Sequence, residues 1–271
     1  MENSIIKRPY ALITGASSGI GIYYTKEMLK RAYNVIVVSN QDEELKKVTE
    51  ELNKNHNPIK LDIISIYKDL AKPQAAQELF DYCSSNSIDI EVLINNAGIF
   101  FFNDIAYCKE SKIDTIINLH VLTPSKLCKL FAEQMIKREK GYILNMSSIS
   151  CHTPFSGIAL YSATKSYIRN FSKALQLELE EHNIKVAVVC PGAVATNLYK
   201  LPKKLQNLGV NLGIIYLPDK FAAKAIKLLF KGKREIIPGY LNRLFRPIYN
   251  IIPHSLKLYA RKKTKVLMKN F

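Results

Sequence analysis

The amino-acid sequence predicts an α/β fold built on a doubly wound parallel sheet. Short runs rich in β-branched residues alternate with longer segments of helical length and spacing, and this order is typical of parallel strands joined by right-handed helical crossovers. Runs such as VIVV and VAVV are continuously apolar, which indicates strands buried on both faces. The 271 residues fit a single domain with a C-terminal extension.

The expected strands occupy residues 10–14, 34–39, 58–62, 91–95, 141–147, 185–190 and 235–238. In such a sheet, ligands bind beyond the carboxyl ends of the strands, near the point where strand order reverses. Residues that carry chemistry should therefore follow strand ends. The stretch 198–218 carries scattered Gly and Pro without periodicity, so we expect a mobile excursion there and not a core element.

The cysteines and the N-terminus indicate a cytoplasmic protein without a metal site. Five cysteines lie far apart, with no C-x-x-C pair, and suggest neither a zinc site nor a disulfide framework: Cys83, Cys108, Cys128, Cys151 and Cys190. The first residues lead almost directly into an apolar strand, without the pattern of a secretory signal. No run reaches the roughly 18 apolar residues of a membrane-spanning helix.

A glycine-rich turn follows the first expected strand. The segment TGASSGIG places Gly15, Gly19 and Gly21 between a strand and a helix, where backbone N–H groups can approach a pyrophosphate near a helix N-terminus. The G-x-x-x-G-x-G spacing differs from the usual G-x-G-x-x-G fingerprint. Taken alone, the three glycines are equally compatible with a purely structural turn.

Tyr161 and Lys165 stand four residues apart in YSATK, at the start of an expected helix. Residues at this spacing share a helix face. A free tyrosine has a pKa of about 10, and a nearby ammonium lowers it by favouring the phenolate. The pair therefore suits proton transfer near neutral pH, although a solvated surface pair is the simpler structural alternative.

Together these segments resemble the short-chain dehydrogenase/reductase family over roughly residues 8 to 240. The resemblance rests on the glycine-rich turn, NNAG at 95–98, NMSS at 145–148, YSATK, and Pro191-Gly192 followed by Thr196. It implies a Rossmann-type fold and the catalytic set Asn118, Ser148, Tyr161 and Lys165. In that family Tyr161 would be the general acid or base, Lys165 would bond the nicotinamide ribose, Ser148 would hold the substrate oxygen, and Asn118 would seat a water.

The same resemblance assigns the residues that bind the cofactor, with Asp62 ending the third expected strand and contacting the adenine. The full set is Gly15, Ser17, Ser18, Gly19, Ile20, Gly21, Ser39, Asn40, Asp62, Asn95, Ala97, Gly98, Tyr161, Lys165, Pro191, Gly192, Val194 and Thr196. An acidic residue after the second strand would favour NAD and a basic one NADP. Ser39, Asn40 and Gln41 offer neither charge, and because they impose no repulsion on a phosphate we favour NADP slightly over NAD.

The resemblance predicts an NAD(P)(H)-dependent oxidoreductase that interconverts a ketone and a secondary alcohol. Apolar residues in the excursion favour a hydrophobic, lipid- or steroid-like carbonyl substrate, or else they pack the lid onto its own domain: Leu198, Tyr199, Leu201, Leu208, Leu212, Ile214, Ile215 and Tyr216. The alternative is a non-catalytic dinucleotide-binding sensor or scaffold that acts through a basic tail. Epimerisation or dehydration on the same residues also remains open.

The chain divides into a dinucleotide-binding domain, residues 1–240 with a lid at 196–218, and an extension at 241–271. Residues 220–271 hold 14 Lys/Arg against one acid, out of a net charge of +16. Apolar residues at helical spacing precede a basic cluster: Leu241, Leu244, Phe245, Ile248, Tyr249 and Ile252, then Arg261, Lys262, Lys263 and Lys265. We expect docking on the domain or a partner subunit, or peripheral contact with an anionic membrane, but no nucleic acid. A homo-oligomer, dimer or tetramer, is implied by the resemblance.

Overall fold

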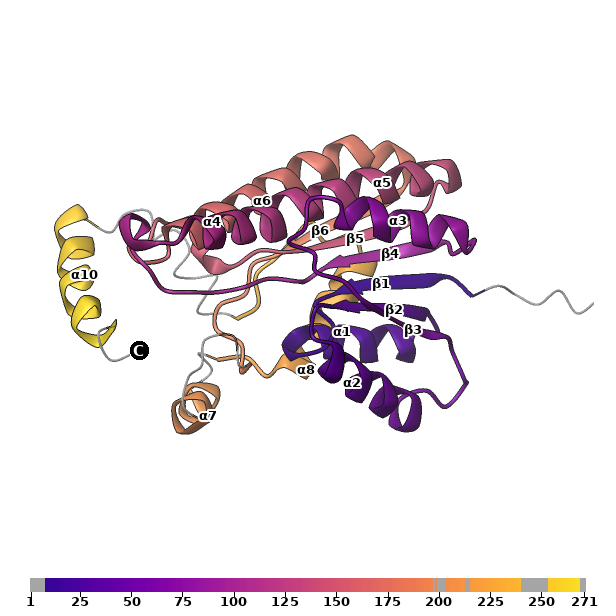
Figure 1. Ribbon diagram of the computed structural model, residues 1–271, viewed down its shortest axis with the longest axis horizontal. Coiled ribbons are helices and arrows are strands. Elements are labelled where there is room, and N and C mark those ends of the chain that lie inside the picture. The colour runs from indigo at the N-terminus through magenta and orange to yellow at the C-terminus, as the bar shows by residue number, and fades with distance from the viewer. Residues whose placement is uncertain (1–7, 197, 199–202, 213–214, 240–252, 269–271) are drawn as a thin grey trace, which may run out of the picture.

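One seven-stranded parallel sheet organises the protein (Figure 1). The computed structural model describes residues 8–196, 198, 203–212, 215–239 and 253–268. Its strands are β1 (Tyr10–Thr14), β2 (Asn34–Ser39), β3 (Ile63–Tyr67), β4 (Ile90–Asn95), β5 (Gly141–Met146), β6 (Ile184–Val189) and β7 (Glu235–Ile236). The sheet order is β3-β2-β1-β4-β5-β6-β7. Strand order therefore reverses between β1 and β4, and the predicted doubly wound fold is confirmed.

Helices cover both faces of the sheet (Figure 1). The helices are α1 (Gly19–Lys30), α2 (Asp42–Asn55), α3 (Ala75–Ser85), α4 (Glu110–Ile117), α5 (Thr123–Arg138), α6 (Ala159–Leu179), α7 (Lys203–Asn211), α8 (Pro218–Phe230) and α10 (His254–Met268). Shorter turns are the 3-10 turns η1 (Ile105–Tyr107), η3 (Ile149–His152) and η4 (Glu180–His182), and the π turn η2 (Asn118–Leu122). Helices α1, α2 and α8 pack on one face, and α3, α5 and α6 on the other.

The core consists of two apolar layers separated by the sheet. Along β1, Ala11 and Ile13 belong to the layer under α1, α2 and α8, whereas Tyr10 and Leu12 belong to the layer under α3, α5 and α6. Successive side chains of a strand point to opposite faces. A strand covered on both sides must therefore be apolar at every position, which is why the continuous apolar runs predicted a parallel sheet correctly.

Six of the seven expected strands overlap observed ones, but the third expectation was wrong. Residues 58–62 precede β3 and form a turn, in which Lys60 has φ +52° and the Asn57 side chain bonds both the N–H and the C=O of Leu61. A left-handed residue cannot continue an extended strand. The observed β3 has the β-branched sequence IISIY and pairs with β2 at the edge of the sheet, directly after the expected range.

The lid stretch contains a helix that its lack of periodicity did not predict. Helix α7 lies within it, and Leu208 and Leu212 are 55% and 60% exposed, while Ile215 is buried. Tyr199, Leu201 and Ile214 lie outside the described residues, as do the six apolar tail residues between 241 and 252. Among the residues that the structure describes, no helix is both long and apolar enough to cross a membrane.

Candidate active site

In the glycine-rich turn between β1 and α1, the backbone at Gly21 lies close to the backbone at Gly15. Gly15 and Gly19 have φ of +66° and +57°, in the left-handed region that glycine tolerates best. A Cβ on Gly21 would lie 2.1 Å from the Gly15 carbonyl oxygen, so no other residue fits there without a backbone shift. Ser18 is exposed and makes no side-chain cap to α1. The turn therefore presents a helix N-terminus of the kind that binds a pyrophosphate.

The NNAG segment fastens the end of β4 to this turn. The N–H groups of Asn96 and Ala97 donate to Thr14 Oγ1 at 2.9 and 3.0 Å, and Asn96 Nδ2 donates to the carbonyls of Thr14 and Gly15. Asn95 points into the protein, where Nδ2 donates to Asn145 Oδ1 at 2.8 Å. The tetrapeptide thus fixes the geometry of the turn at the point where strand order reverses.

The end of β2 forms a closed set of hydrogen bonds. Ser17 Oγ lies 2.7 Å from Ser39 Oγ and donates to Gln41 Oε1 at 3.0 Å, and the Gln41 N–H donates to Ser39 Oγ at 3.1 Å. With the Ser17 proton committed to Gln41, the Ser39 proton goes to Ser17. Ser39 therefore has no spare donor for a phosphate in this arrangement, and the exposed Asn40 is the better placed of the two predicted residues.

The position predicted for Asp62 is wrong. Asp62 precedes β3 and accepts a hydrogen bond from Tyr10 Oη at 2.7 Å, at the amino ends of the strands and away from the glycine-rich turn. Asp69 instead follows the carboxyl end of β3, next to Lys68, whose N–H donates to the Ser39 carbonyl. The error in the strand boundary displaced the aspartate to the wrong edge of the sheet.

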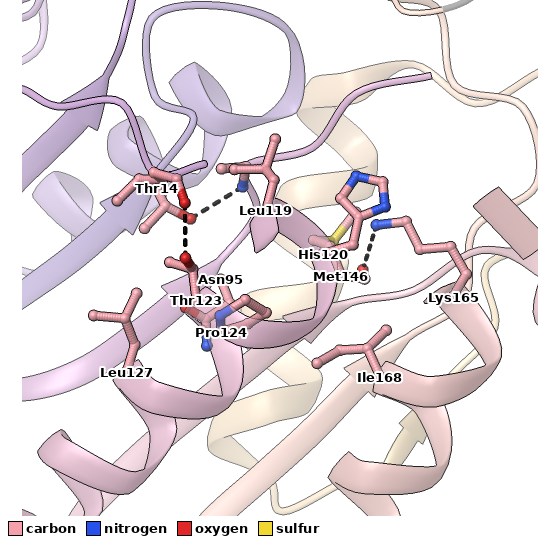
Figure 2. Close-up of a pocket in the computed structure, with 12 residues that line it drawn as sticks. Thr14, Asn95, Leu119, His120, Thr123, Pro124, Leu127, Met146, Lys165 and Ile168 are labelled. Atoms are coloured by element: carbon pink, nitrogen blue, oxygen red, sulfur yellow. Dashed lines mark hydrogen bonds between the residues drawn. The ribbon is translucent and has the colours of Figure 1, made fainter. Parts of the chain in front are cut away.

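Helix α6 carries the predicted Tyr161 and Lys165, and both side chains are buried. Lys165 Nζ lies 5.6 Å from the centre of the Tyr161 ring and donates to the Met146 carbonyl at 2.9 Å, as Figure 2 shows. Burial lowers the pKa of Lys165 from its usual value to about 8, against the raising effect of Cys190 and Cys151. The lysine is thus held by the end of β5 and titrates close to neutral pH.

The other two predicted catalytic residues lie at η3 and η2, two turns that contact helix α6. Ser148 follows β5 and caps η3, where its Oγ accepts from the Ser150 N–H at 3.2 Å, while the neighbouring Ser147 Oγ donates to the Lys165 carbonyl at 2.6 Å. Asn118 begins the π turn η2 between α4 and α5. A single π turn inside a helix is frequent at functional sites.

His120 is a buried part of the site that the sequence gave no reason to single out. Its Nε2 accepts from the Ile99 N–H at 3.0 Å, and its Nδ1 lies 3.0 Å from Thr164 Oγ1. Burial, followed by the charge of Lys165, holds the pKa of His120 well below its usual value, so the ring is neutral. Because Nε2 accepts, Nδ1 carries the proton and donates to Thr164, whose hydroxyl donates to the Tyr161 carbonyl.

Contacts from β4 and β6 complete the neighbourhood. A Cβ on Gly98 would lie 2.9 Å from His120 Nε2 and 3.7 Å from Lys165 Nζ, so NNAG passes directly over the lysine. Thr196 lies against Gly19, because a Cβ there would be 3.6 Å from Thr196 Cγ2. The Ile149 N–H donates to the Pro191 carbonyl at 2.7 Å. Predicted residues from four strand ends thus converge on one edge of the sheet.

Aromatic side chains line the approach to Tyr161. The Phe100 ring lies edge-on to Tyr161 with centroids 5.0 Å apart, and Phe102 is 6.4 Å from Phe100. A small cleft beside them is lined by Phe101, Ile105, Gly157, Leu160 and Tyr161, among others. The lining of this cleft is mostly apolar, and Tyr161 is part of it.

Comparisons with known proteins agree with this geometry. The sequence profile described as "short chain dehydrogenase" matches residues 9–205. The chain is 31% identical to the very-long-chain 3-oxoacyl-CoA reductase of Anas platyrhynchos, over 94% of this chain and 79% of that protein. It is 31% identical to the human inactive hydroxysteroid dehydrogenase-like protein 1, over 83% and 67%. A Sphingobium yanoikuyae short-chain dehydrogenase in complex with NADPH superposes with a TM-score of 0.75 at 24% identity, covering 91% of this chain and 97% of that one.

Proposed function

This chain belongs to the short-chain dehydrogenase/reductase family, and from that premise we propose that it reduces a hydrophobic ketone to a secondary alcohol with NADPH. The general activity is that of the family, whose members are NAD(P)-dependent oxidoreductases acting on CH–OH groups. The observation that carries the proposal is the buried Tyr161 and Lys165 pair, set beside an apolar aromatic wall.

The residues fit a dinucleotide. A Cβ at Gly15, Gly21 or Gly98 would collide with existing atoms. Glycine at these positions leaves the backbone without side chains along the expected cofactor path. The glycine-rich turn would hold the pyrophosphate, Asn40 and Asp69 the adenosine end, and Lys165 with Thr196 the nicotinamide end. A bound cofactor supplies the hydride.

The roles proposed for the four polar residues are those that the family resemblance implies. Ser148 orients the substrate oxygen, and Tyr161 gives its hydroxyl proton to that oxygen as the carbonyl carbon is reduced. The ammonium of Lys165 stabilises the negative charge left on Tyr161. Asn118, at the irregular turn η2, connects the site to solvent. In the direction of alcohol oxidation the same groups act in reverse.

The pH dependence of reduction tests the lysine. We expect kcat/KM for ketone reduction to fall as pH rises through about 8, because Lys165 loses its proton there and no longer stabilises the charge on Tyr161. The measurement is a pH profile of the free enzyme's kcat/KM, with cofactor binding titrated over the same range as the control. A rate that stays level well above that pH while binding is unchanged would contradict the role of Lys165.

The substrate class is inferred from the apolar surroundings of the site. Besides the aromatic wall, several apolar side chains on and near the lid are exposed and could contact an acyl chain or a steroid skeleton: Phe102, Ile105, Tyr107, Leu198, Leu205, Leu208 and Leu212. The names of the two relatives refer to a very-long-chain 3-oxoacyl-CoA and to hydroxysteroids. These observations support a lipid-like carbonyl substrate over a sugar.

A non-catalytic role is the second candidate, because one relative is named as inactive. Catalysis is favoured instead because Ser148, Tyr161 and Lys165 are all present and all buried. The deciding experiment is a fluorescence titration with NADPH and NADH, followed by ketones from small sugars to long-chain acyl ketones and steroids. We expect NADPH to bind and an apolar ketone to accelerate its oxidation. Binding without turnover on any ketone would favour the sensor, and a tenfold kinetic preference for NADH would overturn the choice of NADPH.

The extension is proposed to contact a membrane surface or a partner subunit. Helix α10 exposes Leu256, Leu258 and Tyr259 together with Arg261 and Lys262, a combination that suits an anionic lipid interface. Arg261 also bonds Asp104 at 3.3 Å, which supports docking on the domain itself. If the protein did not float with anionic vesicles, the extension would contact its own domain or a partner subunit and not a membrane.

A further inference from the structure

Two thiols and an imidazole converge just outside the predicted catalytic set. Cys151 and His152 end the turn η3, and Cys190 directly follows β6. One ligand atom from each lies within 4.8 Å of the others, and Cys151 Sγ is 3.8 Å from Cys190 Sγ. The sequence showed no metal site because the two cysteines are far apart along the chain, but β5 and β6 are neighbours in the sheet and bring them together.

The sulfur separation matches tetrahedral coordination. Two thiolates bound to Zn²⁺ at about 2.3 Å with a tetrahedral angle lie about 3.8 Å apart. A sulfur and an imidazole nitrogen on the same ion lie about 3.6 Å apart. All three ligand atoms lie within 4.8 Å of one another, so the imidazole nitrogen is at most roughly 1 Å too far from a sulfur, a gap that a rotation of the side chain can close.

The imidazole has an unsatisfied ligand atom. His152 Nε2 is enclosed and makes no hydrogen bond within the part of the chain that the structure describes. A buried polar atom without a partner costs about 1–3 kcal/mol, so such atoms call for an explanation. Coordination of a cation would satisfy it, and imidazole nitrogen and thiolate sulfur are the donors that zinc prefers.

We propose that Cys151, His152 and Cys190 form a three-residue site for a thiophilic divalent cation, Zn²⁺, with solvent in the fourth position. The site lies between two segments of the predicted active site, because η3 begins after Ser148 and Cys190 precedes Pro191-Gly192. An ion there would tie these segments together.

The test uses the reduced full-length protein without cofactor or substrate, and so does not depend on the proposed function. Co²⁺ is titrated as a spectroscopic probe, and Zn²⁺ is then added to displace it. We expect a thiolate-to-cobalt charge-transfer band at one Co²⁺ per chain, lost in Cys151→Ser and Cys190→Ser. His152→Ala should weaken binding by roughly tenfold or more, and Cys108→Ser, which changes a cysteine elsewhere, should leave it unchanged.

Two results would overturn the site. Absence of the charge-transfer band in the reduced wild-type protein would show that the thiols do not bind the ion. A band that survives in both Cys151→Ser and Cys190→Ser would place the ion elsewhere. His152→Ala keeps both thiols and changes a side chain with an exposed portion, so it remains informative if either serine variant fails to fold, as judged by circular dichroism.

Discussion

Tyr161→Phe is expected to reduce turnover by roughly 10²- to 10⁴-fold while leaving cofactor affinity nearly unchanged. The phenylalanine ring keeps the edge-on contact with Phe100 and the position over Lys165, and only the hydroxyl that donates the proton is lost. The measurement is kcat for the best ketone of the panel together with a fluorescence titration of NADPH. Unchanged cofactor binding with lost turnover would assign the hydroxyl to the chemical step.

Tyr167→Phe is the matched control for this variant. Tyr167 lies on the same helix α6, is 41% exposed, and its hydroxyl pairs with Ser125 Oγ at 3.0 Å. We expect wild-type turnover, because this hydroxyl is on the surface and not at the site. Wild-type turnover in Tyr161→Phe itself would remove the tyrosine from the mechanism and leave the proton donor to be sought elsewhere.

Gly21→Ala is expected to weaken NADPH binding by about tenfold or more and to lower the free energy of unfolding by about 1–3 kcal/mol. The new Cβ would meet the Gly15 carbonyl oxygen at 2.1 Å, and that oxygen also accepts from Asn96 Nδ2. Relieving the collision must therefore move the turn or break its link to NNAG. The measurements are a cofactor titration and urea unfolding of the protein without cofactor.

Gly232→Ala is the matched control, because it replaces a glycine without a close collision and so measures the general cost of losing a glycine. Gly232 follows α8 with φ +72°, and a Cβ there would lie 3.8 Å from the Lys185 side chain. Its substitution should cost about 1–2 kcal/mol for the left-handed conformation alone, with cofactor affinity unchanged. If Gly21→Ala bound NADPH as tightly as the wild-type protein, the turn would not be the pyrophosphate site.

The strands and the order of the motifs were predictable because the signals are local. A strand covered on both faces is apolar at nearly every position, and the continuous runs VIVV in β2 and VAVV in β6 show this pattern. Tyr161 and Lys165 were paired from sequence for the same reason, since four residues fix a shared helix face. The third strand was placed on residues 58–62, although the strand-like sequence IISIY follows directly and forms the observed β3, and the assignment of Asp62 failed with it.

The sequence by itself determined the fold class, the family resemblance and the identity of the tyrosine and lysine pair. Only the tertiary structure decided which aspartate lies at the carboxyl ends of the strands, which ring nitrogen of His120 carries the proton, and that Cys151 lies next to Cys190. Each of these facts is a contact between residues brought together by sheet order and strand register. Local patterns fix the type and face of an element, but they do not encode which distant element packs beside it.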